Sequence, residues 1–111
     1  MEIMQAKENG VVVLKLKGRL DTLSSSTLER KLSDLIGKKE HRLVLDFSQL
    51  EFISSSGLRV LLTAGKQLKS IRGKMVLCML KDHVKEVFDV VGFTVLFSIF
   101  PSEKEAIKEL Q

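Results

Sequence analysis

The sequence has no tryptophan and no tyrosine, and it contains one cysteine, one proline and two histidines among 111 residues. Proteins that bind nucleic acid usually combine clustered basic residues with aromatic side chains that stack on bases. Here the lysines are scattered, and eighteen basic against fourteen acidic residues leave a mild net charge of +4. We therefore expect no nucleic-acid partner.

The scarcity of cysteine excludes a disulfide framework. Cys78 is the only cysteine, so no internal disulfide can form. It lies within the apolar run Val76–Leu80, which predicts a buried strand residue rather than an exposed, reactive thiol. We expect no redox role for Cys78.

No long hydrophobic run occurs either. A membrane-spanning helix needs roughly 20 predominantly apolar residues in succession, and none is present. A secretory signal peptide needs an apolar core, which the opening MEIMQAKENG does not supply. These features predict a cytoplasmic protein with no direct membrane insertion.

The common catalytic motifs are also missing. The serines at 54–56 lack the G-x-S-x-G elbow of a hydrolase, and no glycine-rich loop for nucleotide phosphates occurs. His41 lies in a basic loop and His83 near a helix start, where a solvated or capping role is the simpler interpretation. No spacing of Cys, His and carboxylates suggests a metal site. We expect no catalytic residue, no metal, no cofactor and no enzymatic activity.

The residues that are present have the composition of one globular domain, with 44% hydrophobic and 29% charged residues. Apolar runs predict strands at residues 2–6, 11–16, 43–47 and 75–80. The pair Asn9-Gly10 is expected to fold the first two strands into a hairpin. Residues 93–100 are expected to form a short turn and a last strand.

Helices are expected where apolar residues recur every three or four positions. Four such faces occur: Leu28, Leu32, Leu35 and Ile36, ended by Gly37; Leu58, Leu61, Leu62, Gly65 and Leu68; Val84, Val87, Phe88 and Val91, ended by Gly92; and Ile107 with Leu110. The resulting order β-β-α-β-α-β-α-β-α predicts an α/β fold with a mixed sheet of about five strands and four to five helices.

Polar residues mark the expected helix starts. Ser24–Thr27 offer caps for the first helix, and Ser26 with Glu29 and Ser102 with Glu105 have the spacing of a capping box. Asp82 is expected to cap the third helix. These residues place the helix starts about where the apolar faces begin.

The most informative stretch is Phe52–Lys69, where Ser54–Ser56 and Gly57 precede the central helix. One interpretation is helix capping, by either Ser54 or Ser55. The other is a regulatory phosphorylation site, because a helix N-terminus tolerates the charge of a phosphoserine. Gly57, which has no side chain, is expected to leave room above the first turn for another protein.

Binding groups in parallel sheets gather where strands end and helices begin. Asp21, Asp46 and the stretch Ser54–Gly57 all belong to that set in the predicted fold. Single aspartates at such positions are more often turn and capping residues, which is the simpler interpretation of Asp21 and Asp46.

Several of these residues fall in motifs that resemble a known family. Residues 45–48 (LDFS) and 52–58 (FISSSGL) are similar to the pattern L-D-[LF]-S…[FYM]-[IM]-D-S-[SAT]-G-L of the bacterial anti-sigma factor antagonists, which are STAS domains. Residues 18–21 (GRLD) resemble the family's G-x-[LI]-D, and residues 90–93 (VVGF) resemble its late helix end. The resemblance covers essentially the whole chain and implies one STAS domain over residues 1–111.

The resemblance implies a binding switch in transcription regulation. In this family the unphosphorylated antagonist captures an anti-sigma factor that is also a serine kinase, which frees a sigma factor, and phosphorylation reverses the capture. A serine phosphatase is the implied partner that restores the antagonist. The pattern makes Ser55 the phosphoacceptor. Because Ser54 stands where the family often has aspartate, Ser54 and Ser56 stay as alternative acceptors.

The expected partner surface combines the first turns of the central helix with the loop Asp21–Ser25. The residues assigned to it are Asp21, Ser54, Ser55, Ser56, Gly57 and Arg59, with Lys66 on the outer side of the helix. Solubility alone is an equal explanation for Arg59 and Lys66. The chain itself is expected to be a monomer or a weak dimer.

The sequence leaves two other functions open for the same fold. Related domains occur as accessory subunits of membrane transport systems, where this chain would dock to a separate membrane subunit. A third possibility is a small nucleotide- or lipid-binding module. Phosphorylation at Ser55 distinguishes the signalling function from the transport function, and a retained ligand would identify the third.

Overall fold

Five strands form one sheet in the order β1-β2-β3-β4-β5, so strands that follow one another in the chain are neighbours in space. The computed structural model describes residues 1–111. The strands are β1 (Glu2–Glu8), β2 (Val11–Leu20), β3 (Arg42–Ile53), β4 (Lys74–Cys78) and β5 (Ile99–Phe100), and the helices are α1 (Thr22–Gly37), α2 (Ser55–Ser70), α3 (Asp82–Val90), α4 (Phe93–Leu96) and α5 (Glu103–Leu110). The predicted α/β fold, with five strands and five helices, is confirmed.

The sheet is mixed. Strands β1 and β2 are antiparallel and joined by Asn9 and Gly10, whose φ angles of 53° and 78° match the left-handed turn expected of this pair. All other neighbouring strands are parallel. The carboxyl ends of β2 and β3 therefore lie together, with Leu20 paired to Ile53.

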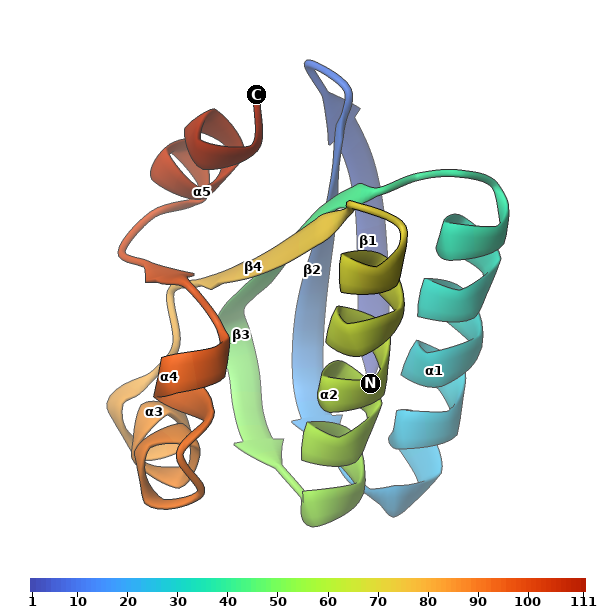
Figure 1. Cartoon of the computed structure of the whole chain (residues 1–111). Coiled ribbons are helices and arrows are strands. Elements are labelled where there is room, and N and C mark those ends of the chain that lie inside the picture. Colours follow the sequence, from blue (N-terminus) through green and yellow to red (C-terminus); the bar gives the residue numbers. More distant parts are fainter.

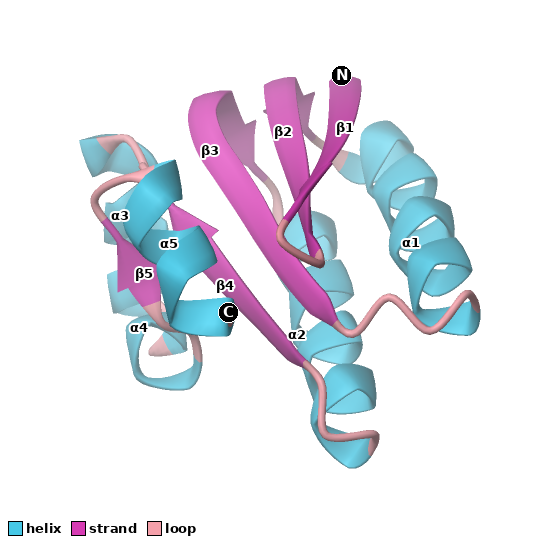
Figure 2. Cartoon of the chain, turned by 90° about the horizontal axis from the view of Figure 1, so that it is seen from above, coloured by secondary structure: helices cyan, strands magenta, loops and turns pink.

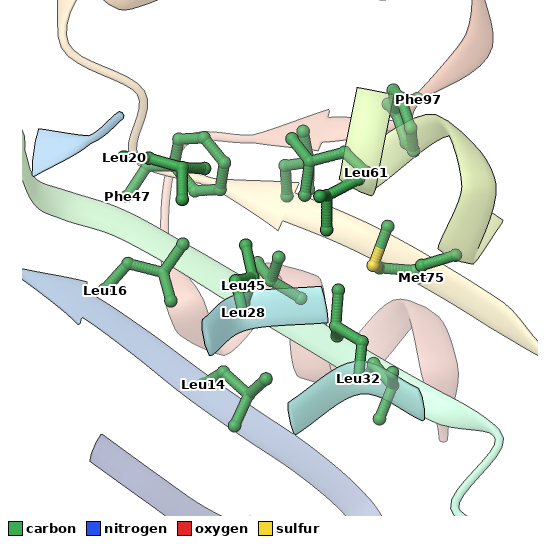
Figure 3. Packing of buried hydrophobic residues seen from close by; sticks show 14 of the residues in the cluster. Leu14, Leu16, Leu20, Leu28, Leu32, Leu45, Phe47, Leu61, Met75 and Phe97 are labelled. Atoms are coloured by element: carbon green, nitrogen blue, oxygen red, sulfur yellow. The ribbon is translucent and has the colours of Figure 1, made fainter. Parts of the chain in front are cut away.

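One face of the sheet carries the main core. Helices α1 and α2 lie against this face, and α5 lies on the opposite side (Figure 1, Figure 2). A cluster of 22 buried residues joins the sheet to α1, α2 and α3, and Figure 3 shows leucines of the strands meeting those of the helices. Phe47 contacts Phe88 of α3 edge to face, with ring centres 5.9 Å apart. This packing fixes the starts of α1 and α2 at one edge of the sheet.

The opposite face has a smaller core beneath α5. It consists of Val11, Val13, Val44, Val76, Cys78, Ala106, Ile107 and Leu110. Cys78 is fully buried, as predicted, and burial raises the pKa of its thiol to about 12, with further contributions from Asp46 and Glu103. The thiol is therefore protonated at neutral pH, which makes it a poor nucleophile.

Asp46 lies on this second face. Burial acts to raise the pKa of its carboxyl, but hydrogen bonds with Glu103 and Ser48 and the charge of Lys15 outweigh burial and lower it. The Ser48 N–H donates to Asp46 Oδ1 at 2.8 Å, and Lys15 Nζ lies 4.0 Å from Oδ2. The hydrogen bond between Asp46 and Glu103 raises the pKa of the Glu103 carboxyl, because a proton on Glu103 is shared with the Asp46 carboxylate.

Several element boundaries differ from those expected. Strand β4 ends at Cys78 rather than Leu80, because Met79 has a left-handed φ of 59°. Helix α3 starts at Asp82 with Lys81 at the N-cap, so the expected cap by Asp82 is wrong. The stretch 93–100 forms the four-residue helix α4 and only two residues of strand, because Phe93 and Phe97 turn inward onto Phe88.

The last helix starts as expected. Ser102 caps α5 by accepting the Glu105 N–H at 3.2 Å, which is half of the predicted capping box.

No helix of the chain combines the length and the apolar character that crossing a membrane requires.

Candidate functional site

The site lies at the edge of the sheet where β2 and β3 end and α1 and α2 begin. Asp21 is the N-cap of α1 and Ser54 is the N-cap of α2. The Ser54 N–H donates to the Leu20 carbonyl oxygen at 2.8 Å. This backbone bond ties the start of α2 to the strand that precedes α1. The starts of α1 and α2, which carry Asp21 and the three serines, share one edge at the bottom of Figure 1.

The three serines of α2 differ in what their hydroxyls do. Ser54 Oγ accepts the Gly57 N–H at 3.1 Å, which selects Ser54 over Ser55 as the helix cap. Ser55 is the first helical residue; its side chain is exposed and makes no hydrogen bond within the chain. Ser56 is half-buried. Ser55 therefore presents the most accessible free hydroxyl of the three.

Gly57 is needed for packing and not for open space outside the helix. Gly57 is buried, and a Cβ atom at this position would lie 2.8 Å from Leu20 Cγ and 3.0 Å from Ile53 Cγ1. The expectation that Gly57 leaves room for another protein is therefore wrong, because its bare side faces the core. Glycine lets the first turn of α2 approach the ends of β2 and β3 closely.

Asp21 starts α1 with a full capping box. Its Oδ1 accepts the Ser24 N–H at 3.0 Å, and the Asp21 N–H donates to Ser24 Oγ at 2.9 Å. The backbone and then the side-chain hydrogen bonds from Ser24 hold the pKa of the Asp21 carboxyl below its usual value. The caps expected among Ser24–Thr27, with Ser26 and Glu29 as a capping box, are wrong, because Asp21 caps the helix and Ser24–Thr27 lie within its first turns.

Asp46 does not belong to this site. Strand β3 continues to Ile53, so Asp46 lies inside the strand and is only 2% exposed. The polar pair Ser48-Gln49 interrupts the apolar run in the sequence, but Leu50 and Ile53 resume the buried pattern after an irregularity in the pairing with β2. The grouping of Asp46 with Asp21 and Ser54–Gly57 is therefore corrected.

The outer surface of α2 is basic. Arg59 lies one turn after Ser55, Lys66 lies two turns further on, and both are exposed as expected. Neither forms an ion pair within the chain. Both side chains are thus available to a partner or to solvent.

Two residues beside the site, Arg19 and Phe52, lie in the family motifs, but the sequence predicted no role for them. The Arg19 guanidinium carbon lies 4.2 Å from the centre of the Phe52 ring, a cation–π contact. Each of these residues stands two positions before a helix cap, Asp21 or Ser54, and they are paired in the parallel register. Equal spacing from two caps is the sequence signal that would have found this contact.

A shallow hollow of about 470 Å³ opens next to Asp21. It is lined by Met1, Arg19, Asp21, Leu23, Ser24 and Thr27. No group of three or more His, Cys, Asp or Glu residues is placed to hold a metal ion. The edge thus offers hydroxyls, one carboxylate, free cations and an exposed leucine, which are groups suited to protein recognition.

The fold and this edge define a small α/β binding domain with an exposed serine at a helix start. A family description for the STAS domain matches residues 2–106. The chain is 40% identical over 106 residues to BtrV of Bordetella bronchiseptica, a candidate anti-sigma factor antagonist, and the match covers 96% of this chain and 91% of that protein. The chain belongs to the STAS domain family, which confirms the resemblance seen in its motifs.

Solved structures share the fold. The crystal structure of a candidate anti-sigma factor antagonist from Thermotoga maritima has a TM-score of 0.93 at 21% identity, covering 97% of this chain and 93% of that one. SpoIIAA of Bacillus in its phosphorylated form has a TM-score of 0.79 at 23% identity, covering 99% and 100%. At these identities the likeness establishes the common architecture.

Proposed function

We propose that this protein is an anti-sigma factor antagonist that works by partner switching in the cytoplasm. The unphosphorylated chain binds an anti-sigma factor that is also a serine kinase, and the sigma factor is released. Phosphorylation of Ser55 ends the binding, and a serine phosphatase restores it. The observation that carries this proposal is the exposed, unbonded Ser55 hydroxyl at the first position of α2. The name of the relative that is 40% identical supports it.

The position of Ser55 suits a modification that leaves the fold intact. The fold takes its α2 cap from Ser54, so a phosphoryl group on Ser55 displaces no hydrogen bond of the helix start. The positive end of the helix dipole stabilises an added anion at this point. The modified chain therefore keeps its structure and changes the charge of one surface.

The energetic effect on a complex is large enough to act as a switch. A phosphoserine carries a charge of about −1.5 to −2 at neutral pH. Burying a charge without a partner costs about 3 kcal/mol or more, and each 1.4 kcal/mol weakens binding about tenfold. An interface that covers a neutral Ser55 is thus weakened by about a hundredfold when Ser55 is phosphorylated.

The test is phosphopeptide mapping after incubation of the purified chain with ATP and its anti-sigma kinase. We expect one phosphoryl group, on Ser55, and none in Ser55→Ala. The matched variants Ser54→Ala and Ser56→Ala should still be modified. Modification of Ser54 or Ser56 instead would move the acceptor and keep the switch.

Binding to the same kinase is measured in parallel. Ser55→Ala should bind as tightly as the native chain and stay bound in the presence of ATP. The proposal would be contradicted if the anti-sigma kinases of the source organism neither bound nor modified the chain. In that case binding to a transport subunit, or a nucleotide or lipid seen by native mass spectrometry, would identify the function.

A further inference from the structure

An arginine beside the site is held in place but has no charged partner. The Arg19 guanidinium stacks over the Phe52 ring at 4.2 Å. Its charge contributes to lowering the pKa of Asp21 through space, yet it forms no ion pair in the chain. Apart from the hydrogen bonds of the sheet, Arg19 makes one hydrogen bond, in which its carbonyl oxygen accepts from Ser24 Oγ at 2.7 Å. The five N–H groups of the guanidinium are therefore free.

An exposed leucine lies on the same edge. Leu23, in the first turn of α1, is 85% exposed, and Phe52 is 37% exposed. Leu23 and Arg19 line the hollow next to Asp21, and Arg19 in turn contacts Phe52. Arg19, Leu23 and Phe52 thus form one connected surface, which we call the Arg19–Leu23 surface.

The composition of this surface is that of a protein interface. Aromatic residues and arginine are enriched at interface centres, and residues that dominate binding are often Arg or aromatic. The stack on Phe52 fixes the guanidinium in advance, which lowers the entropy lost when a partner binds it. A planar guanidinium recognises a carboxylate through two parallel hydrogen bonds. The chemistry that fits Arg19 is a carboxylate next to an apolar side chain that covers Leu23.

Continuity with the serine site identifies the occupant. Asp21 lines the hollow together with Arg19 and Leu23, and it begins the helix that stands beside α2. The Ser54 N–H bond to Leu20 fixes this hollow relative to Ser55. A partner that covers Ser55 and Asp21 therefore meets the Arg19–Leu23 surface next.

We propose that the Arg19–Leu23 surface anchors the anti-sigma factor, with a carboxylate of that partner on Arg19 and an apolar side chain on Leu23. This inference rests on the proposed function and extends it. It assigns binding and switching at this edge to two different groups of residues. The Arg19–Leu23 surface supplies binding strength and partner choice, and Ser55 supplies the switch.

The first experiment compares variants with matched controls that lie elsewhere. Arg19→Lys keeps the charge but loses the planar fork, and Leu23→Ser removes the apolar anchor. Arg72→Lys changes an exposed arginine in the turn before β4, and Val95→Ser changes a valine of α4 that is 88% exposed. The probe is the anti-sigma kinase that modifies the native chain, and the measurement is Kd by titration calorimetry.

We expect Arg19→Lys and Leu23→Ser each to weaken binding about tenfold or more, and both controls to bind within about twofold of the native chain. Circular dichroism and urea unfolding should show that all four variants stay folded. If Arg19→Lys and Leu23→Ser bind like the controls while the native chain binds and is phosphorylated, this inference is wrong and the proposed function stands. If the native chain binds no anti-sigma kinase, both are wrong.

A second experiment tests whether Phe52 positions Arg19. Phe52→Leu should weaken binding severalfold in the native background, because the guanidinium loses its support. In the Arg19→Lys background the same change should have a smaller effect, since the positioned group is already absent. Equal effects in the two backgrounds would show that Phe52 contacts the partner independently and would overturn its positioning role.

Discussion

Two helices start side by side where β2 and β3 end, and three consecutive serines accompany each start. At the start of α1 the cap is Asp21, so Ser24–Ser26 fall inside the first turns, and Ser24 and Ser25 donate their hydroxyls to backbone carbonyls. At the start of α2 the cap is Ser54 itself, and Ser55 is left exposed with a free hydroxyl. Similar sequences thus give two different helix starts. In α1 the serine hydroxyls stabilise the first turn, and in α2 one serine hydroxyl is exposed and unbonded.

The position of the cap decides what a serine can do. Ser25 is 4% exposed and donates to the Asp21 carbonyl at 2.5 Å, so no kinase reaches it while α1 is folded. Ser55 stands one residue after its cap, and its side chain is exposed. A shift of the cap by a few residues changes a structural hydroxyl into one that is available for chemistry.

The largest expected effect comes from adding charge at the two starts. Ser55→Asp should weaken binding to the anti-sigma kinase by about a hundredfold, because an unpaired carboxylate is buried in the complex. Ser26→Asp, at an exposed serine of α1, should weaken it less than tenfold. Equilibrium titration of both variants checks this difference, and equal Kd values would remove the distinction between the two starts.

A steric effect on stability should follow at Gly57. Gly57→Ala places a methyl group 2.8 Å from Leu20 and should destabilise the fold by about 1–3 kcal/mol in urea unfolding. Gly37→Ala, at the last residue of α1, meets nothing within 4 Å and should be neutral or stabilising by up to about 1 kcal/mol. A stable Gly57→Ala protein would show that α2 can move outward without cost.

Removing single hydroxyls should give smaller and more selective effects. Ser24→Ala and Ser54→Ala each lose capping hydrogen bonds and should cost about 1 kcal/mol of unfolding free energy. Ser55→Ala loses no bond and should stay within about 0.5 kcal/mol of the native chain. A clear destabilisation by Ser55→Ala would assign this serine a structural role.

The smallest expected effect is a difference in acid sensitivity between the two caps. The pKa of Asp21 is lowered in the fold by its bonds from Ser24, so its contribution is present above the usual pKa of 3.8 and is lost as the pH falls through the lowered value. Asp21→Asn should reduce the loss of stability below pH 4, while Ser54→Ala should keep the native pH dependence because serine does not titrate there. Urea unfolding at pH 7 and at pH 2.5 measures both slopes.

Periodic patterns predicted most of the fold. The apolar faces of α1 and α2, the Asn9-Gly10 hairpin and the buried Cys78 are confirmed, since each depends on residues close in sequence. The face of α3 is confirmed at Val84, Val87 and Phe88, but Val91 lies after the end of the helix and is exposed. The start of α1 was misplaced because Ser26 and Glu29 fit a local rule that Asp21 satisfies earlier. The continuation of β3 past Asp46 to Ile53 depends on pairing with neighbouring strands, and the end of β4 before Met79 depends on a backbone angle. Local sequence patterns report neither.

The candidate site was only partly predictable for the same reason. Ser55 and Asp21 were identified from motifs, and the structure places both at the same edge. The inward role of Gly57 and the contact between Arg19 and Phe52 arise from the pairing of β2 with β3. Long-range register is the information that a single sequence lacks.

The hydrogen bond from the Ser54 N–H to Leu20 has one more consequence. It ties the start of α2 to the end of β2, directly before the start of α1. If Ser55 is phosphorylated as proposed, the added group would change the surface charge of this edge without separating the two helix starts. Under that proposal, a slow rearrangement of the backbone would not limit the rate of switching.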